Sequence, residues 1–357
     1  MIKLVEDIDI TGLSAQVSSV VTLDLNGHNL QAEGKEEDRL TIIEGGCVTL
    51  IDSVGTGKIF VTKPYKDGYK SSPIYINGGK FVMNSGYIYT VLEDAGNNGQ
   101  YGVVLVGENP EVIINGGIIE AGWFAISGNG SKTHNSKITV NGGQLISTTD
   151  FAIYHPNTGI LTVNGGNVSG AAGAIAINNG DIVLNGGLFN SFGSHMDDYE
   201  QYSSDGTYGL ADAAINVNCK YGASDVDISG GTIVGKSPIL VNTAQYEPEI
   251  EITGGSFIGE SLDVVRQYLA EDVVISDDGT VQEQMPKNED GKELNSILGA
   301  IGCSLEETTK AYIDTELVNR YLSGDQTALF ELYKIARYSE NKAMRAYAFD
   351  RIKAFVK

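Results

Sequence analysis

The tripeptide Asn-Gly-Gly recurs along the first half of the chain and restricts its fold more than any other feature. Its copies begin at Asn77, Asn115, Asn141, Asn164 and Asn185. From the second copy onward the intervals are 26, 23 and 21 residues. Weaker or drifted copies begin at Asn26, Glu44, Ser229 and Thr253. A period of this length indicates a solenoid, in which each unit stacks on the next.

Each unit places short alternating runs on both sides of the glycine pair, as in ILTVNGGNV from Ile160 to Val168. Alternation with β-branched residues predicts strands, and paired glycines predict a sharp corner. One unit cannot bury its apolar face alone, so stacked coils share a core. A leucine-rich horseshoe has a similar period, but its leucine ladder and helical half are missing from the sequence.

We therefore predict a mostly β chain: a right-handed single-stranded parallel β-helix of about 9–10 coils, followed by a small C-terminal α-helical domain. The asparagines of the corners are predicted to stack in register as a structural ladder whose amides bond backbone groups at the turn, with ligand binding as the alternative. This ladder comprises Asn77, Asn115, Asn141, Asn164 and Asn185.

The pattern changes after the last glycine corner, so the chain divides into a β-helix at 1–284, a linker at 285–303 and a helical domain at 304–357. Ser304 and Glu307 form a capping box at the start of the helical part. An apolar stripe follows, composed of Tyr312, Leu317, Val318, Tyr321 and Leu322. Two further helices are predicted at 328–338 and 342–356.

The last predicted helix is basic, and its face is either simply solvated or a docking surface for an acidic partner. The residues proposed for docking are Arg345, Arg351 and Lys353. The helical domain as a whole is balanced, with 11 basic and 11 acidic residues from Pro286 onward.

The excess negative charge lies in the β-helical part. Its first 285 residues hold 13 basic and 35 acidic side chains, which accounts for the net charge of −22. Such a surface disfavours nucleic acid, anionic membranes and polyanionic sugars. Cys47, Cys219 and Cys303 have neither zinc nor disulfide spacing, and the first two are predicted to be core residues. We expect no metal and no cofactor.

Catalytic chemistry is not visible in the β-helical part. A lyase needs an Arg or Lys base, but the only arginines, Arg39 and Arg266, lie near opposite ends, and the middle coils offer only Lys132, Lys137 and Lys220. A hydrolase needs two separated carboxylates, and the adjacent pair Asp197–Asp198 points to opposite faces if it lies on a strand. These residues leave the question of enzymatic activity open and favour a non-enzymatic protein.

The four histidines are scattered, without the spacing of metal ligands. His28 belongs to a corner, where a structural role is expected. His155 precedes Pro156, which predicts an exposed loop position.

Two insertions interrupt the repeats, at 89–101 and 191–210. Long loops on a repeat protein commonly carry its contacts. The second insertion combines aromatic and acidic side chains that suit sugar binding, a protein interface or an ordinary loop. Its candidate ligand contacts are Asp197, Asp198, Tyr199 and Tyr202.

The opening VEDIDI…VVTLDLNGHNL, the glycine corners and the ending SLDVVRQYLAEDVVISDDGTV resemble the pectate-lyase-like β-helix proteins of gut bacteria and their phages. The resemblance covers about residues 1–284 and implies the architecture, but that group includes enzymes, adhesins and structural parts. The separated NTD, DD, GHG and RIK motifs of its pectinases are not met. Asp197–Asp198 and the run from Arg351 to Lys353 match letters only.

The chain opens without an apolar signal segment, so we expect synthesis in the host cytoplasm. Together with the resemblance, this favours a non-enzymatic phage virion protein such as a head fibre, capsid decoration or tail-associated spike. Its expected partners are other virion proteins through the helical domain, further copies in a homotrimer, and host-surface polysaccharide, with no nucleic acid and no membrane. The alternatives are a polysaccharide depolymerase, with Asp197, Asp198 or a lysine as catalyst, and a non-catalytic glycan-binding adhesin.

Overall fold

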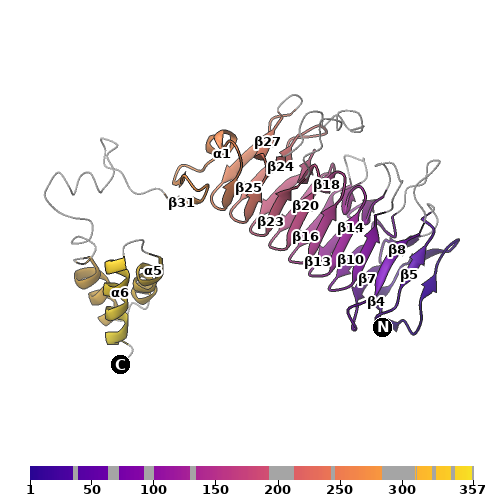
Figure 1. The fold of residues 1–357 in the computed structure, drawn as a ribbon, viewed down its shortest axis with the longest axis horizontal. Helices are drawn as coiled ribbons and strands as arrows, with labels where there is room; N and C mark the ends of the chain where they lie inside the picture. The colour runs from indigo at the N-terminus through magenta and orange to yellow at the C-terminus, as the bar shows by residue number, and fades with distance from the viewer. Residues whose placement is uncertain are drawn as a thin grey trace. The chain divides into compact units, whose positions relative to one another are not determined.

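The repeats of the sequence form three long parallel sheets in the computed structural model (Figure 1). The structure describes residues 1–34, 39–62, 72–91, 100–128, 134–192, 213–242, 246–283, 310, 312–323, 327–338 and 342–355. The chain divides into two compact units, Met1–Glu283 and Gln284–Lys357, which we call the coiled unit and the helical unit.

Sheet A consists, in spatial order, of β1 (Ile2–Lys3), β4 (Val20–Asp24), β7 (Cys47–Ile51), β10 (Lys80–Met83), β13 (Glu111–Ile114), β16 (Ser136–Val140), β19 (Gly159–Val163), β22 (Asp181–Leu184), β25 (Asp225–Ile228) and β28 (Glu249–Ile252). Sheet B consists of β2 (Ile8–Asp9), β5 (Leu30–Ala32), β8 (Lys58–Val61), β11 (Tyr87–Thr90), β14 (Ile118–Ala121), β17 (Gln144–Ser147), β20 (Asn167–Gly170), β23 (Leu188–Ser191), β26 (Thr232–Val234) and β29 (Ser256–Ile258). Sheet C consists of β3 (Ser14–Val17), β6 (Arg39–Ile43), β9 (Ile74–Asn77), β12 (Val103–Val106), β15 (Ile126–Gly128), β18 (Phe151–His155), β21 (Gly173–Ile177), β24 (Ala213–Val217) and β27 (Ser237–Val241).

Consecutive strands lie in sheets A, B and C in turn, and the chain then returns to sheet A one strand further along. Each such circuit is one coil, which is the topology of a parallel β-helix. The turn between sheets A and B is called the A–B corner below, and the turn from sheet C back to sheet A is the C–A corner.

The interior of the coils is lined by columns of apolar side chains. Because successive strand residues point to opposite faces, every second residue enters the core. Phe81 of β10, for example, pairs in register with Val112 of β13, and both side chains are fully buried. The structure thus confirms that the chain forms three parallel sheets stacked around one apolar core.

The two glycines of the A–B corner are needed for different reasons. A Cβ on Gly142 would lie 2.8 Å from the carbonyl oxygen of Asn115 in the preceding coil, so a side chain there clashes with backbone. Gly143 has φ of +84°, a left-handed conformation that costs little only for glycine. The tripeptide therefore combines close coil spacing with a sharp change of direction.

A ladder of side-chain amides follows the A–B corner on its outer side. Asn115 donates through Nδ2 to Oδ1 of Asn84 at 2.8 Å, and the same bond repeats from coil to coil. The later rungs are Asn141, Asn164 and Asn185, each at 2.8 Å, and then Ser229, whose hydroxyl donates at 3.0 Å. The amides bond one another rather than the turn backbone, and the asparagine side chains are exposed.

Asn77 does not belong to this ladder, contrary to the expectation from its tripeptide. It ends β9 in sheet C and pairs with Ile43 and Val106, so it lies at the C–A corner. Its place in the ladder is taken by Asn84, which lacks the Gly-Gly sequence.

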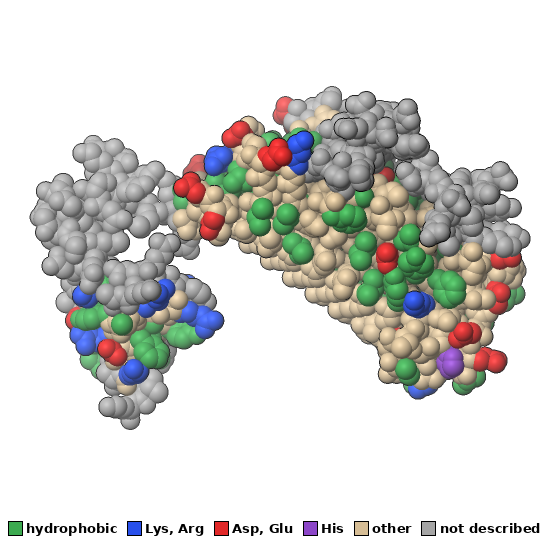
Figure 2. Space-filling view, in the orientation of Figure 1, with side chains coloured by type: hydrophobic (Ala, Val, Ile, Leu, Met, Phe, Trp, Pro, Cys, Tyr) green, Lys and Arg blue, Asp and Glu red, His purple; other side chains and the backbone are tan. Residues whose placement is uncertain are grey.

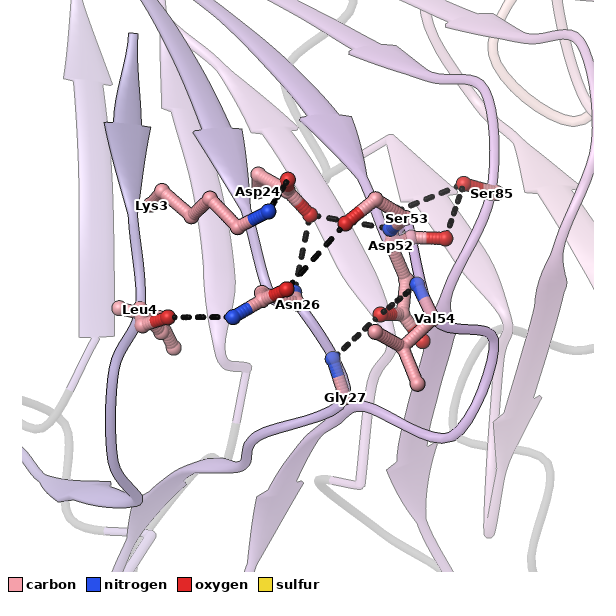
Figure 3. A network of polar contacts seen from close by, with 9 residues as sticks. All are labelled: Lys3, Leu4, Asp24, Asn26, Gly27, Asp52, Ser53, Val54 and Ser85. Atoms are coloured by element: carbon pink, nitrogen blue, oxygen red, sulfur yellow. Dashed lines mark hydrogen bonds and ion pairs between the residues drawn. The ribbon is translucent and has the colours of Figure 1, made fainter.

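At the A–B corner of the first coils, aspartates bond the turn backbone alongside Asn26, whose Nδ2 donates to the Leu4 carbonyl oxygen at 3.0 Å (Figure 3). Asp24 accepts bonds from the backbone N–H groups of Asn26 and Ser53 at 2.9 and 3.0 Å, with Lys3 3.7 Å away. Asp52 accepts from the N–H groups of Gly27 at 2.7 Å and Gly57 at 2.6 Å. The N–H of Ser53 is the main reason why the pKa of Asp24 lies below its ordinary value.

The end of the coil stack that follows β29 is covered by local elements. α1 (Asp263–Gln267) and the antiparallel pair β30 (Val273–Ile275) and β31 (Val281–Glu283) contribute Val265, Val273 and Val281 to the same core. At the opposite end, the first coil exposes Ile2 and Val5, and Val20 at the start of β4 is exposed as well.

The helical unit has its own apolar core. Its described elements are a π-helical turn, η2 (Ile313–Leu317), followed by α4 (Val318–Leu322), α5 (Thr327–Tyr338) and α6 (Lys342–Phe355). The buried core residues are Ile313, Leu317, Ala328, Leu332, Met344 and Ala348. The two last helices lie where the pattern predicted them, whereas the capping box at Ser304 lies outside the described residues.

Candidate functional site

Aromatic side chains gather on the outer surface of sheet B. The surface is formed by outward-pointing residues of β8, β11 and β14 and is called the sheet B face. Its members are Lys58, Phe60, Tyr87, Tyr89, Ile118 and Glu120. Figure 2 shows hydrophobic side chains with cationic and acidic neighbours where Figure 1 places β8 and β14. Unlike the core columns, these side chains are half-buried or exposed.

The register brings these residues together from three coils. Tyr89 pairs with Phe60 of the preceding coil and with Glu120 of the following one. Tyr87 pairs in the same way with Lys58 and Ile118. Two parallel columns of side chains therefore run along the coil axis on this face.

Direct contacts hold the sheet B face in place. The Tyr87 hydroxyl donates a short hydrogen bond to the Glu120 carboxylate. The rings of Tyr87 and Tyr89 meet edge to face with centroids 5.6 Å apart, and the Lys58 ammonium lies 5.1 Å from the Tyr87 centroid. Burial, together with the bond to the Glu120 carboxylate and its charge, raises the pKa of Tyr87 well above its ordinary value. The phenol therefore stays protonated as a donor.

A second aromatic group lies on the outer side of sheet C but is closed to ligands. Phe124 stacks on Trp123 with centroids 4.5 Å apart and on Tyr154 at 4.9 Å. The Trp123 indole N–H donates to Asp150 at 2.6 Å. Phe124 and Tyr154 are buried and only Trp123 is half-buried, so this group packs the structure rather than offering an open platform.

A surface pocket of about 350 Å³ lies at the C–A corner. It is lined by Glu44, Asn77, Gly78, Glu108 and Asn109. Two carboxylates and two amides line it, so the pocket offers groups that bond hydroxyls and that also serve in glycoside hydrolysis. Asn77 thus faces a pocket instead of a ladder.

The ligand contacts predicted in the second insertion cannot be placed. Asp197, Asp198, Tyr199 and Tyr202 lie outside the described residues, as does Lys132.

The remaining candidate bases are dispersed. Lys137 is exposed on β16, Lys220 lies 5.5 Å from the ring of Tyr221, and Arg266 pairs with Asp263 at 3.5 Å. Arg39 stacks on the ring of Tyr75, with 3.7 Å to the centroid. Within the described ranges, no three His, Cys, Asp or Glu side chains are grouped as metal ligands.

The expectation that His155 is exposed is wrong. It ends β18, its register partner in the next coil is Ile177, and its side chain is fully buried. Neither ring nitrogen has a hydrogen-bond partner among the described residues. Burial lowers the pKa of His155 to about 4. His28, by contrast, lies 3.5 Å from Asp7 at the surface.

The two cysteines of the coiled unit differ. Cys219 is fully buried after β24, as predicted, and burial raises the pKa of its thiol. Cys47 is only half-buried on the outer side of β7.

The basic residues proposed for docking are partly engaged within the helical unit. Arg351 forms two bonds to the Asp314 carboxylate, at 2.7 and 3.1 Å, and its guanidinium also lies 4.6 Å from the ring of Tyr347. The bonds from Arg351 and Tyr347 hold the pKa of Asp314 below its ordinary value. Lys353 lies 3.7 Å from Asp350, and Arg345 is half-buried. Arg351 is therefore chiefly a link between η2 and α6.

Comparison with known proteins identifies no matching family model, no similar curated protein and no similar solved structure. Among the helices that the structure describes, none has the length and apolar character needed to cross a membrane. The functional argument therefore depends on the geometry above.

Proposed function

We propose that this chain is a non-enzymatic structural protein of a phage particle, in which the coiled unit is a rigid displayed rod and the helical unit mediates attachment. A right-handed coil is part of this proposal, because crossovers between parallel strands take that hand in about 98% of cases.

The ladder along the A–B corner carries the proposal. Its side-chain bonds run from Asn84 to Ser229 and link successive coils in addition to the backbone ladders of the sheets. Bonds arranged head to tail polarise one another, and a rod with its polar groups committed in this way resists local opening. Such a rod suits a component exposed outside a particle.

The helical unit supports the attachment role. It has its own core and exposes the apolar side chains of Tyr312, Leu322, Tyr333 and Phe349 at 42, 70, 46 and 52%. The Lys353 ammonium lies 4.6 Å from the ring of the exposed Phe349. This combination suits a mixed apolar and electrostatic contact with another protein.

Mass spectrometry and immunogold microscopy of gradient-purified particles test this proposal. We expect the protein in the particles, and we expect a chain truncated after residue 283 to fold but to be missing from them. Detection in host lysate but never in washed particles would refute the assignment.

A polysaccharide hydrolase remains the second candidate because Glu44 and Glu108 both line the pocket at the C–A corner. Reducing-end assays on host capsular and plant glycans test this alternative, with Glu44→Gln and Glu108→Gln as the inactive controls. Turnover that both substitutions abolish would replace the non-enzymatic assignment.

A further inference from the structure

The sheet B face combines half-buried aromatic rings from adjacent coils with hydrogen-bonding groups. Phe60 and Tyr89 are neighbours in one column, and Tyr87 lies beside them in the other. Lys58 and Glu120 supply a donor and an acceptor next to these rings. Aromatic faces bordered by directed polar groups match the alternating C–H and hydroxyl surfaces of a sugar.

We propose that the sheet B face binds an uncharged oligosaccharide that lies along the coil axis. The C–H faces of the sugar rings stack on Phe60 and Tyr89. The Glu120 carboxylate accepts a hydrogen bond from a sugar hydroxyl, and the Lys58 ammonium donates one.

The dimensions of the face favour a chain over a single sugar. Strands in a sheet are about 4.8 Å apart, so the face spans about 10 Å from β8 to β14 and about 14 Å if Gln144 of β17 is included. Gln144 is exposed and pairs in register with Ile118, so its amide continues the column. Several linked sugar rings can therefore contact the face simultaneously.

The charge of the coiled unit favours an uncharged ligand. The first 285 residues carry 35 acidic and 13 basic side chains, which repel uronate or sialate chains at low ionic strength. Lys58 of β8 is the cation on the face itself, and the Glu120 carboxylate of β14 balances its charge two strands away, so the face has no excess positive charge to attract a polyanion.

The face is organised before any ligand arrives. Tyr87 is held by its bond to Glu120 and by its edge-to-face contact with Tyr89, and both tyrosines stand on a hydrogen-bonded strand. Side chains that are already ordered lose little entropy on binding, which favours affinity.

The test uses the full chain on a printed array of neutral and uronate-containing oligosaccharides, followed by titration calorimetry with the strongest neutral binder. We expect neutral binding that Tyr89→Ala and Phe60→Ala each weaken by about tenfold, the effect of losing one stacked ring. Tyr89→Phe keeps the ring and should retain the affinity.

Tyr246→Ala is the matched control, because Tyr246 is 44% exposed and lies between β27 and β28, away from the face. It should leave the affinity unchanged. Unchanged fluorescence of Trp123 and unchanged far-UV circular dichroism verify that each variant is folded. Binding to no neutral glycan, binding to acidic glycans alone, or equal loss in the Tyr246 variant would overturn the proposal.

This site goes beyond the particle assignment and can fail separately from it. If the protein is present in particles but binds no sugar, only the proposal of the sheet B site fails. If the protein binds sugar but is absent from particles, only the particle assignment fails.

Discussion

Acidification should destabilise the coiled unit through His155 before it affects the carboxylates. The buried imidazole has a pKa of about 4, compared with 6.5 for an unperturbed histidine. The unfolded chain therefore takes up a proton as the pH falls below 6.5, whereas the folded chain does not until about pH 4. The free energy of unfolding falls through this window and levels off below it.

The two pKa values determine the size of the effect. Relative to neutral pH, His155 should cost about 2 kcal/mol at about pH 5 and at most about 3 kcal/mol below its folded pKa. His155→Leu removes the titrating group and the two unpaired ring nitrogens while keeping an apolar side chain in the column. The variant should lose this dependence and be at least as stable at neutral pH.

Urea unfolding followed by tryptophan fluorescence measures this effect in the coiled unit alone, because the chain has 1 tryptophan and Trp123 lies in that unit. Titrations at about pH 7.5, 6 and 5 should give curves that diverge between wild type and His155→Leu. His28→Gln, at a half-buried surface histidine, is the matched control and should follow wild type. Equal pH dependence in wild type and His155→Leu would refute the reasoning.

Substitutions at three further positions test the corners and the helical unit. Gly142→Ala should cost about 1–3 kcal/mol in the same urea assay, because its Cβ meets the Asn115 carbonyl oxygen at 2.8 Å; a neutral effect would contradict the close coil spacing. Asn141→Ala should cost about 1 kcal/mol and Asn141→Ser less, since a hydroxyl can still bond along the ladder; equal losses would argue against the ladder. Arg351→Lys removes the two-point binding to Asp314 and should lower the melting temperature of the helical unit, as measured by circular dichroism. For so exposed a pair we expect a cost of about 1 kcal/mol or less. An unchanged melting temperature would show that this pair does not hold η2 to α6.

The contrast between Asn77 and Asn84 shows the limit of reasoning from a motif. Asn77 carries the full tripeptide yet lies at the C–A corner, whereas Asn84 lacks it and occupies the ladder. A motif predicts a sharp corner because glycine conformation is local. Which corner it forms depends on strand register, which is set by core residues such as Phe81 pairing with Val112.

The sheet B face could have been anticipated in part. Alternation within β8 and β11 indicates that Phe60 and Tyr89 point to the same side of their strands. Phe60 and Tyr89 are 29 residues apart in the sequence. Whether they become neighbours in the sheet depends on the length of the coil between them, which differs from one repeat to the next. His155 shows the same limit, since the following Pro156 favours a loop while the register turns the imidazole inward beside Ile177.

The sequence by itself determined the period, the alternation of the strands, the glycine corners, the acidic surface of the coiled unit and the separate helical pattern. Each of these follows from interactions between near neighbours or from composition. The tertiary structure alone decided which side chains share a column. It placed Asn84 in the ladder, the His155 imidazole in the core, and the aromatic rings of adjacent coils on the sheet B face. Those groupings join residues one coil apart, and coils of unequal length leave no constant spacing from which they could be predicted.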